Sequence, residues 1–158
     1  MATAAPGARA EHVGSSSVPE LAGKNIVDML LPAEPEEIPA ITEALVAVGF
    51  RRQEGRDPFP ATRPMLEGSL REAGEIFWIH LHVVPVGEPE IEEMRAFRDR
   101  LRRDPSLRDA YVAEKRRIVG EGVPDSLEYS YRKAQFVIDT LHGMGFPVER
   151  HSDPPPRA

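Results

Sequence analysis

The sequence contains no cysteine. This absence excludes disulfide bonds, thiolate zinc sites and cysteine nucleophiles. No apolar run approaches the roughly 20 residues that a membrane-spanning helix needs, and the first residues lack the apolar core of a signal peptide. An excess of basic residues is also absent. The net charge of −6 and the isoelectric point near 5.4 disfavour a general nucleic-acid-binding protein. We therefore expect a cytoplasmic protein without membrane contacts.

The remaining composition is that of a folded protein. Of the 158 residues, 41% are hydrophobic and 29% are charged, which predicts one packed domain rather than general disorder. We expect this single domain to span residues 8–148. Residues 1–7 are small and featureless and residues 149–158 are rich in proline, so both segments are predicted to be disordered tails.

Strand patterns come early in the chain and helix patterns come late. Short strands are predicted at residues 10–13 and 25–31, the second bounded by Pro32, and the clearest strand is predicted at residues 75–84 with a hairpin partner at 65–70. A helix is predicted over residues 35–48, a proline-containing loop over 54–65, and three further helices in the second half. This order predicts an α/β or α+β domain with a helical C-terminal half.

A serine-rich turn follows the first predicted strand. It consists of Gly14, Ser15, Ser16 and Ser17. Free backbone N–H groups and hydroxyls in such a turn bind phosphate oxygens, and Asp28 on the next predicted strand is placed to hold a divalent metal against that phosphate. The alternative is an ordinary serine-rich turn beside an aspartate at a sheet edge, because Gly-Ser turns are common.

Two histidines lie two residues apart in the clearest strand. His80 and His82 therefore point to the same face of that strand, with Cα atoms roughly 7 Å apart. The opposite face of the strand is wholly apolar, so the histidine face is the candidate site for a shared ligand or metal. The alternative is a pair of half-buried histidines that hydrogen-bond within the sheet. His12, close before the serine turn, is a further candidate metal ligand.

Residues 95–117 form a basic stretch with nine basic and four acidic side chains. Such a stretch favours a phosphate-rich ligand. The alternative is a solvated helix surface with ion pairs between residues one turn apart. The candidate phosphate-binding cations of the whole chain are Lys24, Arg98, Lys115 and Lys133.

Four segments, in order, resemble the sequence blocks of the GrpB family. Residues 11–31, EHVGSSSVPELAGKNIVDMLL, resemble the family signature, which is usually close to EHIGSTSVPGLAAKPIIDILV. The later segments are HLHVV, FRDRLRRDPSLRDAYVAEK and YRKAQFVI, and the resemblance covers about residues 9–141. It implies a nucleotidyltransferase fold, a short mixed sheet flanked by helices, and a nucleotidyltransferase activity. Related domains attached to dephospho-coenzyme A kinases support a role that involves nucleotides.

The resemblance makes the serine turn the phosphate site and Asp28 the first metal-binding acid. That superfamily places a second acid two residues later, where this chain has Leu30, and a third acid on a later strand, where this chain has His80 and His82. Members of the family usually carry an earlier helix, and because only some ten residues precede the signature here, we expect that helix to be missing. We therefore expect either an exposed core there or cover by another chain, which leaves a homo-oligomer open.

These departures leave three hypotheses about function. The first is a nucleotidyltransferase that acts on a nucleotide and a small-molecule or protein acceptor, with Ser15 and Asp28 in its catalytic site and Mg²⁺ or Mn²⁺ as its metal. The second is a non-catalytic module that binds a nucleotide or a coenzyme, because Leu30 removes a metal ligand. The third is a metal-dependent hydrolase of unrelated type. Two histidines and one carboxylate suit a single manganese, iron or zinc ion, and its ligands would be His12, Asp28, His80 and His82.

Overall fold

The computed structural model describes residues 9–19, 21, 25–55, 57–122 and 126–148. The chain divides into two compact units, Met1–Arg95 and Ala96–Ala158. The predicted tails, residues 1–7 and 149–158, lie outside the described residues. The expected single domain over residues 8–148 stays a prediction.

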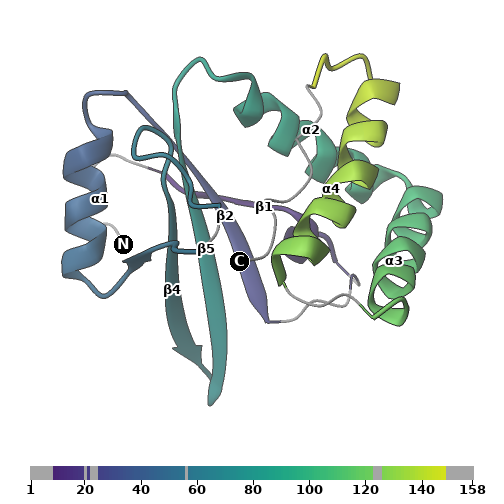
Figure 1. Cartoon of the computed structure of the whole chain (residues 1–158), viewed down its shortest axis with the longest axis horizontal. Coiled ribbons are helices and arrows are strands. Elements are labelled where there is room, and N and C mark those ends of the chain that lie inside the picture. Colours follow the sequence, from purple (N-terminus) through teal and green to yellow (C-terminus); the bar gives the residue numbers. More distant parts are fainter. Residues whose placement is uncertain (1–8, 20, 22–24, 56, 123–125, 149–158) are drawn as a thin grey trace. The chain divides into compact units, whose positions relative to one another are not determined.

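The first unit is built on a mixed five-stranded sheet with the order β1-β2-β5-β4-β3 (Figure 1). Its strands are β1 (Glu11–Val13), β2 (Ile26–Ala33), β3 (Arg51–Arg52), β4 (Met65–Glu72) and β5 (Glu75–Pro85). Strands β2 and β5 are parallel, and the other neighbouring pairs are antiparallel. The predicted mixed sheet is confirmed, while β3 is too short to leave a pattern in the sequence.

Strand β2 runs past the boundary that Pro32 predicted. Pro32 pairs with Val84 of β5, and the ladder continues to Ala33. On its other side, β1 pairs with β2 only as far as Leu30. Because proline is tolerated where its missing N–H faces no strand, the short β1 explains why β2 does not end at this residue.

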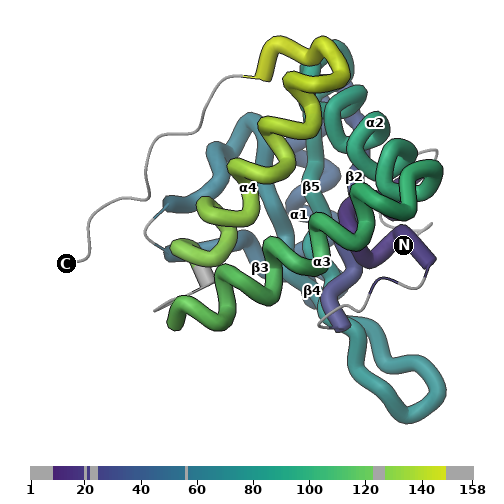
Figure 2. The backbone as a smooth tube through the Cα atoms, turned by 90° about the vertical axis from the view of Figure 1, so that its right-hand side faces the viewer, coloured from purple at the N-terminus to yellow at the C-terminus, as the bar shows by residue number. Residues whose placement is uncertain are grey.

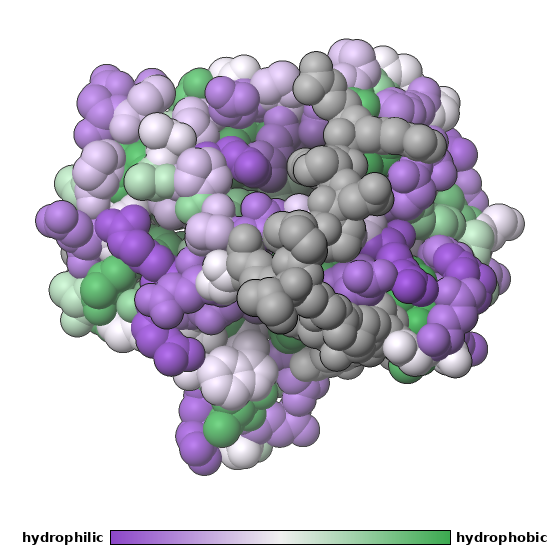
Figure 3. All heavy atoms as spheres, viewed as in Figure 1, coloured by the Kyte–Doolittle hydropathy of each residue, from purple (hydrophilic) through white to green (hydrophobic). Residues whose placement is uncertain are grey.

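A two-residue turn fixes the register between β4 and β5. Ala73 and Gly74 have φ angles of 49° and 86°, as a type I′ hairpin turn requires at both central positions. The flanking Glu72 and Glu75 pair, and counting back along both strands places Glu67 opposite His80. The joined ends of β4 and β5 extend past the neighbouring strands (Figure 2). At the lower edge of Figure 3, where these joined strand ends project, apolar and polar residues lie side by side.

Helix α1 (Ile38–Ala47) covers one face of the sheet. The helix begins three residues later than the pattern predicts, because residues 34–37 form a turn in which the Glu37 N–H donates to the Glu34 carbonyl at 2.9 Å. The covered face of β5 is the apolar one predicted from the sequence. The buried cluster contains Leu31, Ala33, Ile38, Ile41, Leu45, Leu66, Leu81 and Val83.

The first residues of helix α2 (Pro89–Arg103) cover part of the opposite face. Ile91 and Met94 pack there against Val13, Leu30 and Val84, three residues with no exposed surface. Leu30 therefore lies in a core, although it occupies the strand position where the resemblance places an acid.

The second unit is helical, as predicted. It contains the rest of α2 with α3 (Pro105–Gly120) and α4 (Ser126–Gly143). The side chain of Asp104 caps α3 by accepting the Leu107 N–H at 3.1 Å. Aromatic contacts link Phe97 of α2 to Tyr111 of α3, and Tyr111 to Phe136 of α4. Across the described ranges, no helix combines the length and hydropathy needed to cross a membrane.

Candidate functional site

The serine turn lies directly against Asp28. Strand β1 ends at Val13, and Gly14 leads into a short 3₁₀ helix, η1 (Ser15–Ser17). Gly14 has φ 66° and ψ −171°, a region that only glycine adopts readily. A Cβ atom added at Gly14 would lie 2.7 Å from Asp28 Oδ2. A glycine is therefore needed here both for the backbone geometry and for the close approach to the carboxylate.

Two of the three serine hydroxyls hold the turn in place. The Ser17 hydroxyl donates to the Gly14 carbonyl at 2.7 Å. The Ser16 oxygen accepts the Asp28 N–H at 3.2 Å and lies 3.0 Å from His12 Nε2. The half-buried Ser15 hydroxyl makes no hydrogen bond within the described part of the chain, so it is available to a ligand.

Replacing Gly14 by alanine is expected to destabilise the first unit by about 1–3 kcal/mol and to displace Asp28, because the new Cβ combines backbone strain with the clash against the carboxylate. The free energy of unfolding is measured in urea by the fluorescence of Trp78, the single tryptophan, for the first unit and by circular dichroism for the helical second unit. The matched control is Gly120→Ala at the end of α3, where a Cβ meets nothing within 4 Å and φ is not positive. Equal stability of the two variants would contradict the expected strain.

Ionisable side chains form a row across the site face of the sheet. Asp28 pairs in register with His80, His80 pairs with Glu67, and Glu67 pairs with Arg51 of β3. Side chains at paired positions share a face. Asp28 Oδ1 lies 3.7 Å from His80 Nδ1, and both side chains are about 30% exposed, at 28% and 32%. The structure thus brings together the serine turn, Asp28 and His80 from three segments that are distant in the sequence.

Within the described residues, the other two predicted metal ligands do not join this pair in a metal-binding group. His12 is in register with Met29, so it extends from the face opposite Asp28. His82 lies two residues beyond His80, where the ring of Phe59 packs edge-on against it at 5.5 Å. In the described ranges, no group of three or more histidine, aspartate or glutamate side chains is close enough to hold a metal ion. The described side chains therefore do not form a complete metal site by themselves, and Asp28 and His80 supply two adjacent donors.

The four predicted phosphate-binding cations fall into two groups. Lys24 lies outside the described residues. Arg98, Lys115 and Lys133 belong to the helical unit. There the Arg98 Nε donates to Asp99 at 2.8 Å, which lowers the pKa of that carboxyl, and the two lysines lie over tyrosine rings of their own helices. Within the basic stretch, the pattern of local ion pairs favours the solvated-helix interpretation. Such pairs include Arg100–Asp104, Arg117–Glu114 and Arg117–Glu121.

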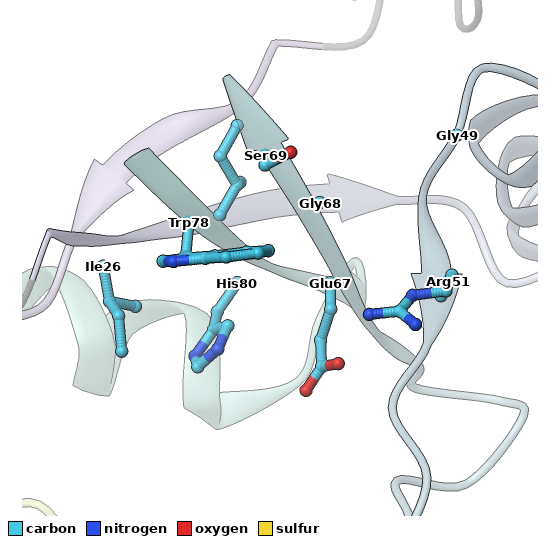
Figure 4. Close-up of a pocket in the computed structure, with 9 residues that line it drawn as sticks. Ile26, Gly49, Arg51, Glu67, Gly68, Ser69, Trp78 and His80 are labelled. Carbon is cyan, nitrogen blue, oxygen red and sulfur yellow. The ribbon is translucent and has the colours of Figure 1, made fainter. Parts of the chain in front are cut away.

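A pocket of about 290 Å³ lies beside the acid–histidine pair (Figure 4). His80 borders both the pocket and Asp28, and the pocket continues toward Trp78, Glu67 and Arg51. Sequence patterns alone missed these three residues as site candidates. The signal that finds Glu67 is the Ala73–Gly74 turn, because a two-residue hairpin sets the whole register of β4 against β5. The rest of the lining is Ile26, Gly49, Gly68, Ser69 and Ile79.

Comparison with solved structures defines the class of fold. The structure is similar to the crystal structure of the conserved protein GrpB from Enterococcus faecalis, with a TM-score of 0.61, 23% sequence identity, and 87% of this chain and 82% of that chain covered. It is also similar to the Cid1 poly(U) polymerase in its MgGTP-bound structure, with a TM-score of 0.54, 16% identity, and 89% of this chain and 45% of that chain covered. At these identities the likeness concerns the fold, which is nucleotidyltransferase-like.

Sequence comparisons place the chain within one family. The model of the family described as GrpB protein matches residues 1–142, and the chain belongs to this family. A UPF0157 protein of Deinococcus radiodurans is 34% identical over 138 residues, which cover 87% of this chain and 68% of that protein. The UPF0157 protein SCO7215 of Streptomyces coelicolor is 33% identical over 129 residues, covering 81% and 64%. The chain thus spans about two thirds of the length of these relatives.

Proposed function

We propose that this protein is a nucleotidyltransferase that binds a nucleoside triphosphate at the serine turn and transfers its nucleotidyl group to a small-molecule or protein acceptor. The observation that carries the proposal is the close approach of Gly14 to Asp28, which brings the serine turn against a partly exposed carboxylate. The nucleotidyltransferase-like fold supports the same reaction class.

The serine turn would position the phosphates. Its Ser15 hydroxyl has no hydrogen-bond partner among the residues described, whereas Ser16 and Ser17 keep the turn rigid. In the reaction, an acceptor oxygen would form a bond to the α-phosphorus as the bond to pyrophosphate breaks, pyrophosphate would leave, and the proton of the acceptor would pass to water. Rigid donors at the phosphate favour such a transfer, since catalysis of phosphoryl-type reactions consists mainly of positioning and charge stabilisation.

Asp28 and His80 would hold the divalent cation that this class of reaction uses. Mg²⁺ is commonly bound by one or two carboxylates together with substrate phosphates, and Mn²⁺ also accepts imidazole, so two protein donors fit an ion shared with the substrate. Such an ion would offset the negative charge of the triphosphate. The same donor set does not support the hydrolase hypothesis, in which four side chains bind one ion, because His12 extends from the opposite face.

The proposal is tested by calorimetric titration of each nucleoside triphosphate into the protein with and without Mn²⁺, together with an assay for pyrophosphate release. We expect Mn²⁺ to strengthen nucleotide binding, because the ion offsets the charge of the triphosphate, and we expect pyrophosphate to accumulate once an acceptor is supplied from a small-molecule extract. Absence of binding for all four nucleotides under both conditions would overturn the proposal.

A non-catalytic nucleotide-binding module is the second candidate, and the burial of Leu30 favours it. The position of the second acid is filled by a fully buried side chain, so the usual carboxylate pair is absent from β2. For such a module, the same titration would show nucleotide binding that is independent of metal, and pyrophosphate would not be released.

A further inference from the structure

The pocket beside His80 has the composition of a site for a planar, hydrogen-bonding ring. The indole of Trp78 is 53% exposed, although large apolar side chains are usually buried. Trp78 is in register with Ile26 and Ser69. It lies two residues before His80 on β5, and its side chain is therefore on the same face of the sheet as the Asp28–His80 pair. An exposed aromatic ring beside a phosphate site is a stacking surface, and stacking on aromatic rings is a common way to bind nucleobases.

The same pocket contains a carboxylate and a guanidinium that are available to a ligand. Glu67 of β4 and Arg51 of β3 are paired in register, yet within the described residues neither side chain has a hydrogen-bond or ion-pair partner. Figure 4 shows the Glu67 carboxylate and the His80 ring on the same side of the sheet, with the Arg51 guanidinium extending from β3 toward them. A half-buried carboxylate without a donor favours a ligand that presents N–H groups.

We infer that this pocket binds the nucleobase of the substrate, with the base stacked on Trp78 and its N–H edge donating to Glu67. The inference rests on the proposed function and specifies the class of nucleotide that the site would bind. A carboxylate accepts from adjacent N–H donors and repels carbonyl oxygens, so the base with two adjacent donors, guanine, is favoured over uracil, whose single N–H lies between two carbonyls. The volume of about 290 Å³ lies at the lower end of ligand pockets, which suits one base.

The position of His80 explains how one nucleotide would occupy both sites. His80 lines the pocket and also lies 3.7 Å from the carboxylate of Asp28. Trp78 and His80 are two residues apart on β5, so their Cα atoms are separated by roughly 7 Å. A nucleotide with its base on Trp78 therefore has its sugar near His80 and its phosphates near the serine turn.

The test uses nucleosides, which have a base but no phosphate. Trp78 is the single tryptophan, so its fluorescence reports directly on the pocket. Titration with guanosine is expected to quench this fluorescence, while ribose 5-phosphate, which has no base, is expected to leave it unchanged. Guanosine is expected to bind about 10-fold more tightly than uridine, a typical discrimination for a paired hydrogen-bonding edge, and Glu67→Gln is expected to remove this preference.

Two substitutions of Trp78 complete the test. By calorimetry, Trp78→Leu is expected to weaken guanosine binding roughly 5- to 150-fold, the range found when a stacking ring is lost, whereas Trp78→Phe keeps a ring and retains most of the affinity. Unchanged fluorescence with every nucleoside, or wild-type affinity in Trp78→Leu, would overturn the inference. Asp28→Asn is expected to bind guanosine normally. In the wild-type protein, nucleoside binding without any pyrophosphate release would reject the transfer reaction alone, and pyrophosphate release without a response of Trp78 would reject the base pocket alone.

Discussion

Replacing Asp28 by asparagine is expected to lower the rate of pyrophosphate release by about 100- to 1000-fold, the effect of removing one preorganised electrostatic group from a reaction centre. Asparagine has nearly the same shape as aspartate but lacks its charge, so it would no longer bind a cation against the phosphates. Asp28 is the carboxylate that lies against the serine turn, and its neighbour His80 is an imidazole that cannot replace the lost negative charge.

The matched control for this prediction is Asp109→Asn, which removes the same charge from an exposed position of α3. We expect this variant to keep the wild-type rate. Thermal unfolding of both variants shows whether either change affects the fold. A rate for Asp28→Asn that is within a few-fold of the control, in a folded protein, would remove Asp28 from the reaction.

Replacing Leu30 by aspartate, which restores the acid pair of the superfamily, is expected to destabilise the first unit by about 4 kcal/mol or more instead of activating the protein. The reason is the position of Leu30 beneath α2, where it packs with Val13, Val84, Ile91 and Met94 and has no exposed surface. A carboxylate at this position loses its hydration and gains no partner. Urea unfolding followed by Trp78 fluorescence measures the change.

Two variants show whether burial is the cause. Leu70→Asp makes the same chemical change at a residue that is 51% exposed on β4 and is expected to cost within about 1 kcal/mol. Leu30→Met keeps the volume and the apolar character of the buried side chain and is expected to cost less than about 1.5 kcal/mol. A stable Leu30→Asp protein with increased metal affinity would show that the position is open to the site, contrary to this structure.

The turn and the nearby strands were predictable because their signals are local. Gly14 and the serines mark a turn, and apolar runs mark β2 and β5. The alternation of residues along β5 predicts that His80 and His82 face away from the apolar side of the strand, which is the side that α1 covers, and the register confirms this. The proximity of His80 to Asp28 follows once β2 and β5 are neighbouring parallel strands, a pairing that periodicity alone does not give.

The remaining features depend on tertiary structure. The two-residue β3 has no periodic pattern, and Arg51 comes to the pocket only through its pairing with Glu67. His12 and His82 share the residue type of His80 but not its surroundings, because one extends from the other face and one contacts Phe59. In the sequence, Leu30 stands where the superfamily has a metal-binding acid. In the structure, the same residue packs against α2 and so has a structural role.

The most direct measurement of the central claim is a crystal structure of the protein with Mn²⁺ and a nucleoside triphosphate analogue whose bond between the α- and β-phosphates resists cleavage. Anomalous scattering locates the manganese without ambiguity. The account predicts manganese at the Asp28 carboxylate, with the triphosphate on the turn formed by Gly14 and the serines. A nucleotide bound elsewhere on the molecule, with no manganese at Asp28, would contradict it.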